Sequence, residues 1–258
     1  MSRIADAFEN GKAFIAYLMA GDPDLETAAE LIVEAQEAGA DLIEIGIPFS
    51  DPIAEGEVIQ QASIRALSAG TKLDGVFGMV ASLKRRVRVP LVFMTYLNPV
   101  FVFGYERFFA KCREIGVCGI IIPDLPYEEQ AEVKVVANQY GVELVTLIAP
   151  TSNQRIEAIA KNAEGFLYLV SSMGVTGMRQ SITTDIRAVI RDIRAATGLQ
   201  VAVGFGISSE EQVEKYSTIA DGVIVGSAIV KLVGEYAKAA GPKVSEYIRR
   251  LKGVQRKA

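Results

Sequence analysis

Residues 42–56 read LIEIGIPFSDPIAEG and carry the clearest structural signal in the chain. Residues 42–47 are apolar except for Glu44, and the two prolines that follow prevent a helix, so the stretch predicts a buried strand that leads into a polar loop. Alternate side chains of a strand share a face, which puts Glu44 on the opposite face from the three isoleucines. A carboxylate in such a strand is costly to bury unless it pairs with a buried cation or has a catalytic task. We expect the catalytic task for Glu44, because it lies at the carboxyl end of the strand.

The same kind of strand recurs along the chain, each time followed by a segment of helical period. We expect strands at residues 14–19, 42–47, 91–95, 119–122, 143–148, 166–170, 201–203 and 222–225. We expect helices at residues 2–9, 24–38, 58–69, 73–85, 105–115, 127–139, 153–162, 184–196 and 209–216, with two more beginning at Ser227 and Pro242. Strands this apolar are typical of parallel strands covered by helices on both faces.

The number of strands and the chain length predict an α/β fold of the (β/α)8 TIM-barrel class, with an extra N-terminal helix. A doubly wound open sheet is the alternative, but it would carry a glycine-rich dinucleotide turn after its first strand. Residues 19–23 read MAGDP, which is not such a turn. No linker or low-complexity segment divides the chain, so we expect one domain over residues 1–258.

Composition narrows the choice of partners. Half of the 258 residues are hydrophobic, and 27 basic against 31 acidic residues give a net charge of −4. No basic block stands out, so we expect no nucleic-acid partner, and we expect the short basic tail at residues 252–257 to be solvated. No apolar run is long enough to span a membrane, and residues 1–9 contain no apolar signal core. We therefore expect no membrane partner and a cytoplasmic location.

The chain contains no histidine, which restricts its chemistry. Ser-His and Cys-His nucleophile pairs and histidine-ligated metals are excluded, so acid-base work near neutral pH falls to Glu, Asp, Tyr, Lys or a perturbed Cys. Cys112 and Cys118 lack a zinc-type spacing, and we expect both to be buried free thiols. We expect no metal site.

In a barrel of this class the site lies in the loops that follow the strands, and two of these loops are long. The loop after the second strand carries Asp51, Glu55 and Glu57. Glu55 could form a carboxylate pair with Glu44 or belong to a solvated acidic loop, and solvation is the preferred interpretation for Glu57. The other long loop, residues 171–181, has two glycines that permit hinge motion or close approach to a ligand, although an ordinary flexible loop would also contain them.

Glycine turns follow the last two strands. Residues 204–209 read GFGISS and residues 226–228 read GSA, and each turn opens a helix. Exposed backbone N–H groups at helix N-termini favour anions, so these turns predict a phosphate site, with plain turn chemistry as the alternative. Tyr96, Asn98 and Tyr168 lie in or after other strands, where they could belong to the core or to a pocket. The residues alone predict a phosphorylated small substrate and a carboxylate acid-base pair, without naming the substrate.

These residues resemble the tryptophan synthase alpha subunit family along nearly the whole chain. The matching motifs are GDP at 21–23, EIGIPFSDP at 44–52, TYLNP at 95–99, PDLP at 123–126, GVTG at 174–177, GFGISS at 204–209 and GSAIV at 226–230. The resemblance implies a lyase that cleaves indole-3-glycerol phosphate into indole and glyceraldehyde 3-phosphate. It implies that Glu44 protonates the indole carbon that carries the side chain, so that the carbon–carbon bond breaks in a retro-aldol sense. The second family carboxylate, usually Asp, corresponds to Glu55, which is one methylene longer.

The resemblance also implies roles for other residues and for a partner. Tyr168 corresponds to a tyrosine beside the catalytic pair, Tyr17 and Tyr96 to walls of the indole pocket, and Thr176 to a lid residue. The implied phosphate site consists of Gly177, Phe205, Gly206, Gly226 and Ser227. Two alpha and two beta chains assemble in this family, and Asp51, Pro52, Asn98 and Pro126 correspond to positions near the contact with the beta subunit. The cofactor, pyridoxal phosphate, belongs to that partner, so we expect none in this chain.

Three other interpretations stay open at this point. A free-standing lyase that releases indole would have much the same sequence. The change at Glu55 could leave a weak lyase that serves mainly as an allosteric subunit of the beta chain. A different phosphate-binding barrel, such as a sugar-phosphate isomerase, is the remaining enzyme alternative.

Overall fold

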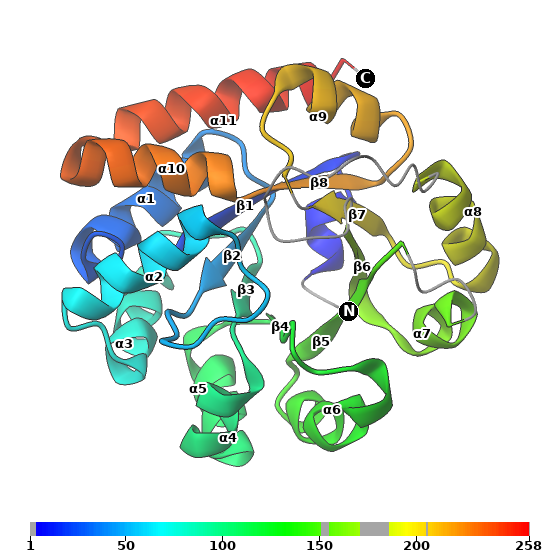
Figure 1. Cartoon of the computed structure of the whole chain (residues 1–258), viewed down its shortest axis with the longest axis horizontal. Helices are drawn as coiled ribbons and strands as arrows, with labels where there is room; N and C mark the ends of the chain where they lie inside the picture. Colours follow the sequence, from blue (N-terminus) through cyan, green and yellow to red (C-terminus); the bar gives the residue numbers. More distant parts are fainter. Residues whose placement is uncertain (1–3, 151–154, 171–185, 205, 258) are drawn as a thin grey trace.

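A computed structural model describes residues 4–150, 155–170, 186–204 and 206–257 (Figure 1). Eight parallel strands close into a barrel in which each strand pairs with the next one along the chain and β8 returns to β1. The strands are β1 (Ala13–Met19), β2 (Leu42–Gly46), β3 (Leu91–Met94), β4 (Gly119–Ile121), β5 (Glu143–Ile148), β6 (Glu164–Val170), β7 (Val201–Gly204) and β8 (Gly222–Val225). The predicted (β/α)8 barrel is confirmed.

Helices form a ring around the barrel (Figure 1). The α-helices are α1 (Leu25–Glu37), α2 (Glu57–Ser68), α3 (Leu73–Leu83), α4 (Leu97–Phe103), α5 (Tyr105–Ile115), α6 (Gln130–Gln139), α7 (Ile156–Asn162), α8 (Ile186–Ala196), α9 (Glu210–Ser217), α10 (Ser227–Tyr236) and α11 (Gly241–Gln255). Three short 3-10 helices are η1 (Ala5–Phe8), η2 (Tyr127–Glu129) and η3 (Ala237–Ala239). Asp24 caps α1 as expected, because its carboxylate accepts the N–H of Thr27 at 2.8 Å.

Helix α4 was not among the helices expected from the sequence. Pro99 lies within its first turn, where a missing N–H costs nothing. The first helical N–H, of Leu97, donates to the Asp124 carboxylate at 2.9 Å, so a neighbouring loop supplies the cap. The N-terminal helix is also shorter than expected and is the 3-10 helix η1.

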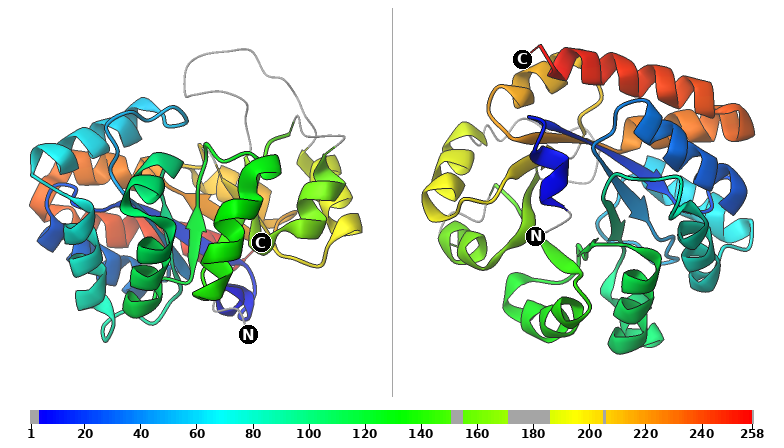
Figure 2. Two further views of the ribbon diagram at one scale, coloured as in Figure 1. Left: turned by 90° about the horizontal axis from the view of Figure 1, so that it is seen from below. Right: turned by 180° about the vertical axis from the view of Figure 1, so that it is seen from behind.

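Two apolar layers hold the fold together. Ile43, Ile45 and Ile47 share one face, as the alternation predicted, and pack outward between the sheet and the helices. Leu42 belongs to the separate cluster inside the barrel, together with Ile4 and Phe8 from the N-terminal segment. This segment lies across the end of the barrel at which the strands begin (Figure 2). The opposite end, where the strands finish, is therefore the open one.

The basic tail was expected to be solvated, and for Lys252 this is wrong. Helix α11 continues to Gln255, and Lys252 is only 7% exposed. Its ammonium donates to Asp41 Oδ2 at 2.5 Å, to the carbonyl of Lys12 at 3.0 Å and to Gln255 Oε1 at 3.0 Å. Within the described ranges, no helix is long and apolar enough to cross a bilayer.

Candidate active site

The open end of the barrel contains a cavity of about 400 Å³. Its inner wall consists of inward-facing residues near the strand ends: Tyr17, Glu44, Met94, Leu147, Tyr168 and Ile224. The rim comes from the loops, including Glu55, Pro126, Gly206, Gly226 and Ser227. The cavity thus brings together both predicted carboxylates and the two predicted glycine turns.

Glu44 points into the barrel from the middle of β2, where it is 1% exposed. Its neighbours across the ladder are Tyr17 on β1 and Val92 on β3, and neither is a cation. Oε1 of Glu44 is buried and has no hydrogen-bond partner in the part of the chain that the structure describes. Burial raises the pKa of Glu44 to about 8, because desolvation disfavours its charged form. Glu44 therefore carries a proton at neutral pH and can donate it into the cavity.

Glu55 reaches the cavity from the loop between β2 and α2. Its Oε2 is also buried without a partner among the described residues, and burial raises the pKa of Glu55 to about 7. Near neutral pH this carboxyl is present in both protonation states. Both carboxyls therefore hold a proton more tightly than an ordinary glutamate does, and Glu44 is the more deeply buried of the two.

Two hydrogen bonds hold the backbone on either side of Glu55. The N–H of Ala54 donates to the Tyr96 hydroxyl at 3.0 Å, and the Gln60 amide donates to the carbonyl of Glu55 at 2.8 Å. Tyr96 is 2% exposed and its ring lies 5.3 Å from that of Phe49, centroid to centroid. Tyr96 was expected to form a wall of the pocket, but it is not among the residues that line the cavity and instead lies behind the loop.

Two tyrosines stand beside the carboxyls. Burial raises the pKa of both Tyr17 and Tyr168 far above the ordinary range, and the negative charge of Glu44 adds to both shifts. Glu55 also raises the pKa of Tyr17, so this hydroxyl lies close to both carboxyls. A Cβ at Gly46 would lie 2.0 Å from the Tyr17 oxygen, and one at Gly204 would lie 2.4 Å from the Tyr168 oxygen. These glycines therefore make room for two neutral hydroxyls in the cavity.

The two glycine turns differ in their capacity for an anion. Helix α9 begins with a capping box in which Ser209 Oγ accepts the N–H of Gln212 and the Gln212 side chain accepts the N–H of Ser209. Helix α10 begins at Gly226-Ser227 without a side-chain cap, so its first N–H groups are available at the edge of the cavity. Gly206, at φ +82°, lines the same cavity. The α10 turn is the stronger anion site.

Other predicted residues lie on the rim or outside the described residues. Asp51, Asn98 and Pro126 are exposed and Pro52 is partly buried, and their expected contact with a partner stays a prediction. Thr176, Gly177 and Phe205 lie outside the described residues. Cys112 and Cys118 are buried and form no disulfide among the described residues, as expected. The described ranges contain no group of three or more acidic or cysteine side chains arranged to hold a metal.

Sequence reasoning missed several residues that line the cavity. Met94, Leu147 and Ile224 share inward parity with Glu44 at the strand ends, so alternation could have identified them. Gln130 and Arg155 come from the beginnings of two outer helices, where no local pattern marks them.

Comparison with known proteins decides the family. The sequence pattern of a family described as "Tryptophan synthase alpha chain" matches residues 4–257. The chain belongs to the tryptophan synthase alpha chain family. It is 45% identical over 252 residues to the tryptophan synthase alpha chain of Lacticaseibacillus casei, which covers 98% of this chain and 95% of the relative.

Solved structures agree with this membership of the tryptophan synthase alpha chain family. Tryptophan synthase subunit alpha from Legionella pneumophila superposes with a TM-score of 0.90 at 32% identity, with each chain covered completely (100%). A chain from the tryptophan synthase a2b2 complex of Pyrococcus furiosus gives 0.86 at 38% identity, covering 94% of this chain and 99% of that chain. Membership makes this chain a carbon–carbon lyase of tryptophan biosynthesis that cleaves indole-3-glycerol phosphate.

Proposed function

We propose that Glu44 is the proton donor of this lyase reaction and that Glu55 assists it at the indole nitrogen. The main support is the state of Glu44, which is buried and protonated near neutral pH, with an oxygen that no described residue occupies. A general acid works best when its pKa lies near the working pH. Tyr168 and Tyr17 stand beside it as neutral hydroxyls and contribute hydrogen bonds without adding charge.

In the proposed reaction Glu44 gives one proton to the substrate and later takes one back. Glu44 protonates the ring carbon that carries the glycerol side chain, and the Glu55 carboxylate accepts a hydrogen bond from the ring N–H, whose nitrogen becomes positively charged but keeps its proton. The bond from this carbon to the side chain then breaks, and its electron pair returns to the ring. The adjoining side-chain hydroxyl gives up its proton as it becomes the aldehyde, and the Glu44 carboxylate is the base that receives it. Glu44 thereby returns to its starting state.

The phosphate of the substrate is proposed to bind at Gly226 and Ser227. The uncapped start of α10 offers backbone N–H groups and the positive end of a ten-residue helix. Gly206 lies on the same cavity wall. Holding the anion at β8 fixes the reacting carbon over the Glu44 side of the barrel, which is the positioning that the reaction needs.

The proposed assembly contains two of these chains and two beta chains, with pyridoxal phosphate only in the beta chain. Its support is the similarity to a chain of an a2b2 complex. The loop after β2 and helix α4 also expose three large apolar side chains, Ile53 (74%), Phe101 (64%) and Val102 (73%). Exposed apolar groups of this size are typical of protein contact surfaces. The four rim residues Asp51, Pro52, Asn98 and Pro126 are proposed to belong to this contact.

The direct test is indole release from indole-3-glycerol phosphate by wild type and by Glu44→Gln. Loss of a general acid predicts about 10²–10⁴-fold lower kcat. Glu57→Gln, an exposed carboxyl at the start of α2, is the matched control and should retain wild-type activity. If Glu44→Gln kept most of its activity, the proposed proton donor would be wrong.

A second measurement addresses the assembly. Adding a beta subunit should raise the rate of indole formation in the wild-type chain, because binding at the rim orders the loop that carries Glu55. An unchanged rate would favour the free-standing lyase. Negligible lyase activity in wild type, together with stimulation of the beta chain, would favour the purely allosteric subunit.

A further inference from the structure

The cavity extends beyond the residues that the reaction uses. Its wall also includes Leu125, Tyr127, Gln130, Arg155 and Ile159, around the first turns of α6 and α7, and we call this part of the cavity the lobe. This lobe lies next to β4 and β5, whereas the anion turn lies at β8. In a closed ring of eight strands these positions face each other across the barrel. A ligand held at β8 can therefore extend across the mouth toward the lobe.

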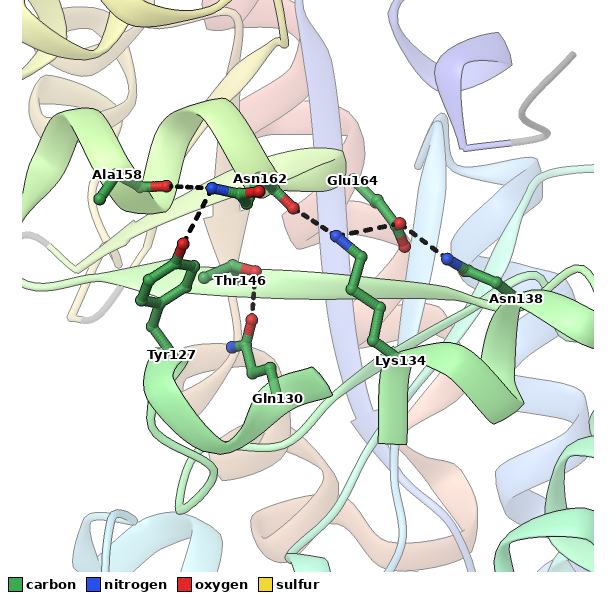
Figure 3. A network of polar contacts seen from close by, with 8 residues as sticks. All are labelled: Tyr127, Gln130, Lys134, Asn138, Thr146, Ala158, Asn162 and Glu164. Atoms are coloured by element: carbon green, nitrogen blue, oxygen red, sulfur yellow. Dashed lines mark hydrogen bonds and ion pairs between the residues drawn. The ribbon is translucent and has the colours of Figure 1, made fainter. Parts of the chain in front are cut away.

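Gln130 is the polar side chain of this lobe that is buried, with 9% exposure. Its Oε1 accepts the hydroxyl hydrogen of Thr146 at 3.3 Å, which fixes the carboxamide. Its Nε2 points away from Thr146 (Figure 3) and makes no hydrogen bond within the described ranges. This nitrogen is not among the described buried polar atoms that lack a hydrogen-bond partner, so it is accessible from the cavity and can donate to a group there. The Gln130 amide therefore offers N–H donors in a fixed orientation to a ligand group in the lobe.

The neighbouring polar groups already have partners. The Tyr127 hydroxyl accepts from Asn162 at 2.8 Å, on the side away from Gln130 (Figure 3). The Arg155 guanidinium pairs with Glu128 at 2.6 Å, and both side chains are more than half exposed. The Gln130 amide N–H is thus the donor in the lobe that can favour a ligand group that accepts a hydrogen bond over one that does not.

The proposed function places a particular part of the substrate here. With the phosphate at β8 and the reacting carbon at Glu44, the indole ring must extend away from the glycine turns. The part of the cavity that remains is the β4–β5 side, and its inner wall is the apolar Met94 and Leu147. The benzenoid edge of the ring then faces the lobe and the Gln130 amide.

We propose that Gln130 forms a subsite for indole rings that carry a compact, uncharged hydrogen-bond acceptor on the benzenoid ring. Unsubstituted indole leaves the amide without a partner, whereas a nitrile nitrogen on the ring accepts its N–H. This inference rests on the proposed function, because the orientation of the ring comes from it.

The test uses the reverse reaction of the full-length chain, in which indole condenses with glyceraldehyde 3-phosphate. Cyanoindoles and ethynylindoles are compared at each free position of the benzenoid ring, because the two groups have nearly the same shape and only the nitrile is a strong acceptor. The readout is the cyano-to-ethynyl ratio of kcat/KM. Comparing this ratio between enzyme variants cancels the different intrinsic reactivities of the two indoles.

Two variants remove the donor in different ways. Gln130→Glu keeps an oxygen for Thr146 but replaces the donor, and Gln130→Met keeps the length of the side chain without an amide. At one ring position or more, both should lower the cyano-to-ethynyl ratio by about three- to tenfold, the effect expected of one hydrogen bond. Because the ratio is taken within each variant, any general loss of activity toward all indoles cancels. A merely structural role of Gln130 would lower all substrates equally.

Equal ratios in wild type and both variants at every ring position would overturn this subsite while leaving the lyase reaction intact. Failure of the wild-type chain to condense indole itself would instead overturn the proposed function, and the subsite would fall with it. The two results are distinguishable in one experiment.

Discussion

The two ends of the barrel bury polar groups in opposite ways. At the end where the strands begin, the Lys252 ammonium is buried and makes three hydrogen bonds, one of them to the Asp41 carboxylate. At the end where they finish, Glu44 is more deeply buried, yet one of its oxygens has no partner among the described residues. Ile4 and Phe8 close the first end, and the second opens into a cavity.

This difference between the two ends shows which buried polar groups serve stability and which serve function. A satisfied buried charge holds helices and strands together, and its removal leaves its partners unpaired. An unsatisfied buried carboxyl weakens the fold and is retained where a ligand supplies the missing partner. The buried polar contacts that stabilise the fold therefore lie at the end where the strands begin, and the reactive carboxyl lies at the end where they finish.

The largest expected effect is on the pH dependence of stability. The pKa of Glu44 is raised in the folded chain, from 4.5 to about 8. The folded state therefore binds this proton more tightly than the unfolded state, and the contribution is complete below about pH 4.5 and lost as pH rises through about 8. Between these limits, the free energy of unfolding should fall in wild type on the order of 4 kcal/mol more than in Glu44→Gln. Urea unfolding at a series of pH values measures this, and parallel curves for the two proteins would contradict it.

The next effect concerns the satisfied end. Lys252→Met leaves Asp41 and Gln255 without their cation and should lower the free energy of unfolding by roughly 2–4 kcal/mol. Lys257→Met, an exposed lysine of the same tail, is the control and should have little effect. Urea unfolding of the three proteins compares them at one pH. Equal free energies of unfolding for wild type and Lys252→Met would mean that the buried contacts of Lys252 do not stabilise the fold.

The smallest effect concerns the loop that carries Glu55. Tyr96→Phe removes the acceptor of the Ala54 N–H and should lower kcat/KM for indole formation by about three- to tenfold. Its far-ultraviolet dichroism should stay that of wild type, since the ring remains packed on Phe49. Tyr105→Phe, on the neighbouring helix α5, serves as the control. If both variants behaved alike, Tyr96 would not position the loop.

The sequence predicts most of the fold because its information is local. Strand alternation placed Glu44 on the opposite face of its strand from the three isoleucines, and glycine turns marked the last two strand ends. Helix α4 could not be predicted, because the cap that stabilises its first turn comes from Asp124, 27 residues away from Leu97. The bond from Ala54 to Tyr96 joins residues 42 apart, and Lys252 reaches Asp41 across 211 residues. Such contacts exist only after the barrel has closed.

The central claim is that Glu44 holds its proton at neutral pH because it is buried without a partner. Carbon-13 NMR of the chain labelled at the glutamate carboxyls measures this directly, and the signal that disappears in Glu44→Gln assigns the residue. We predict that this signal titrates near pH 8. A midpoint near the ordinary glutamate value of about 4.3 would contradict the account.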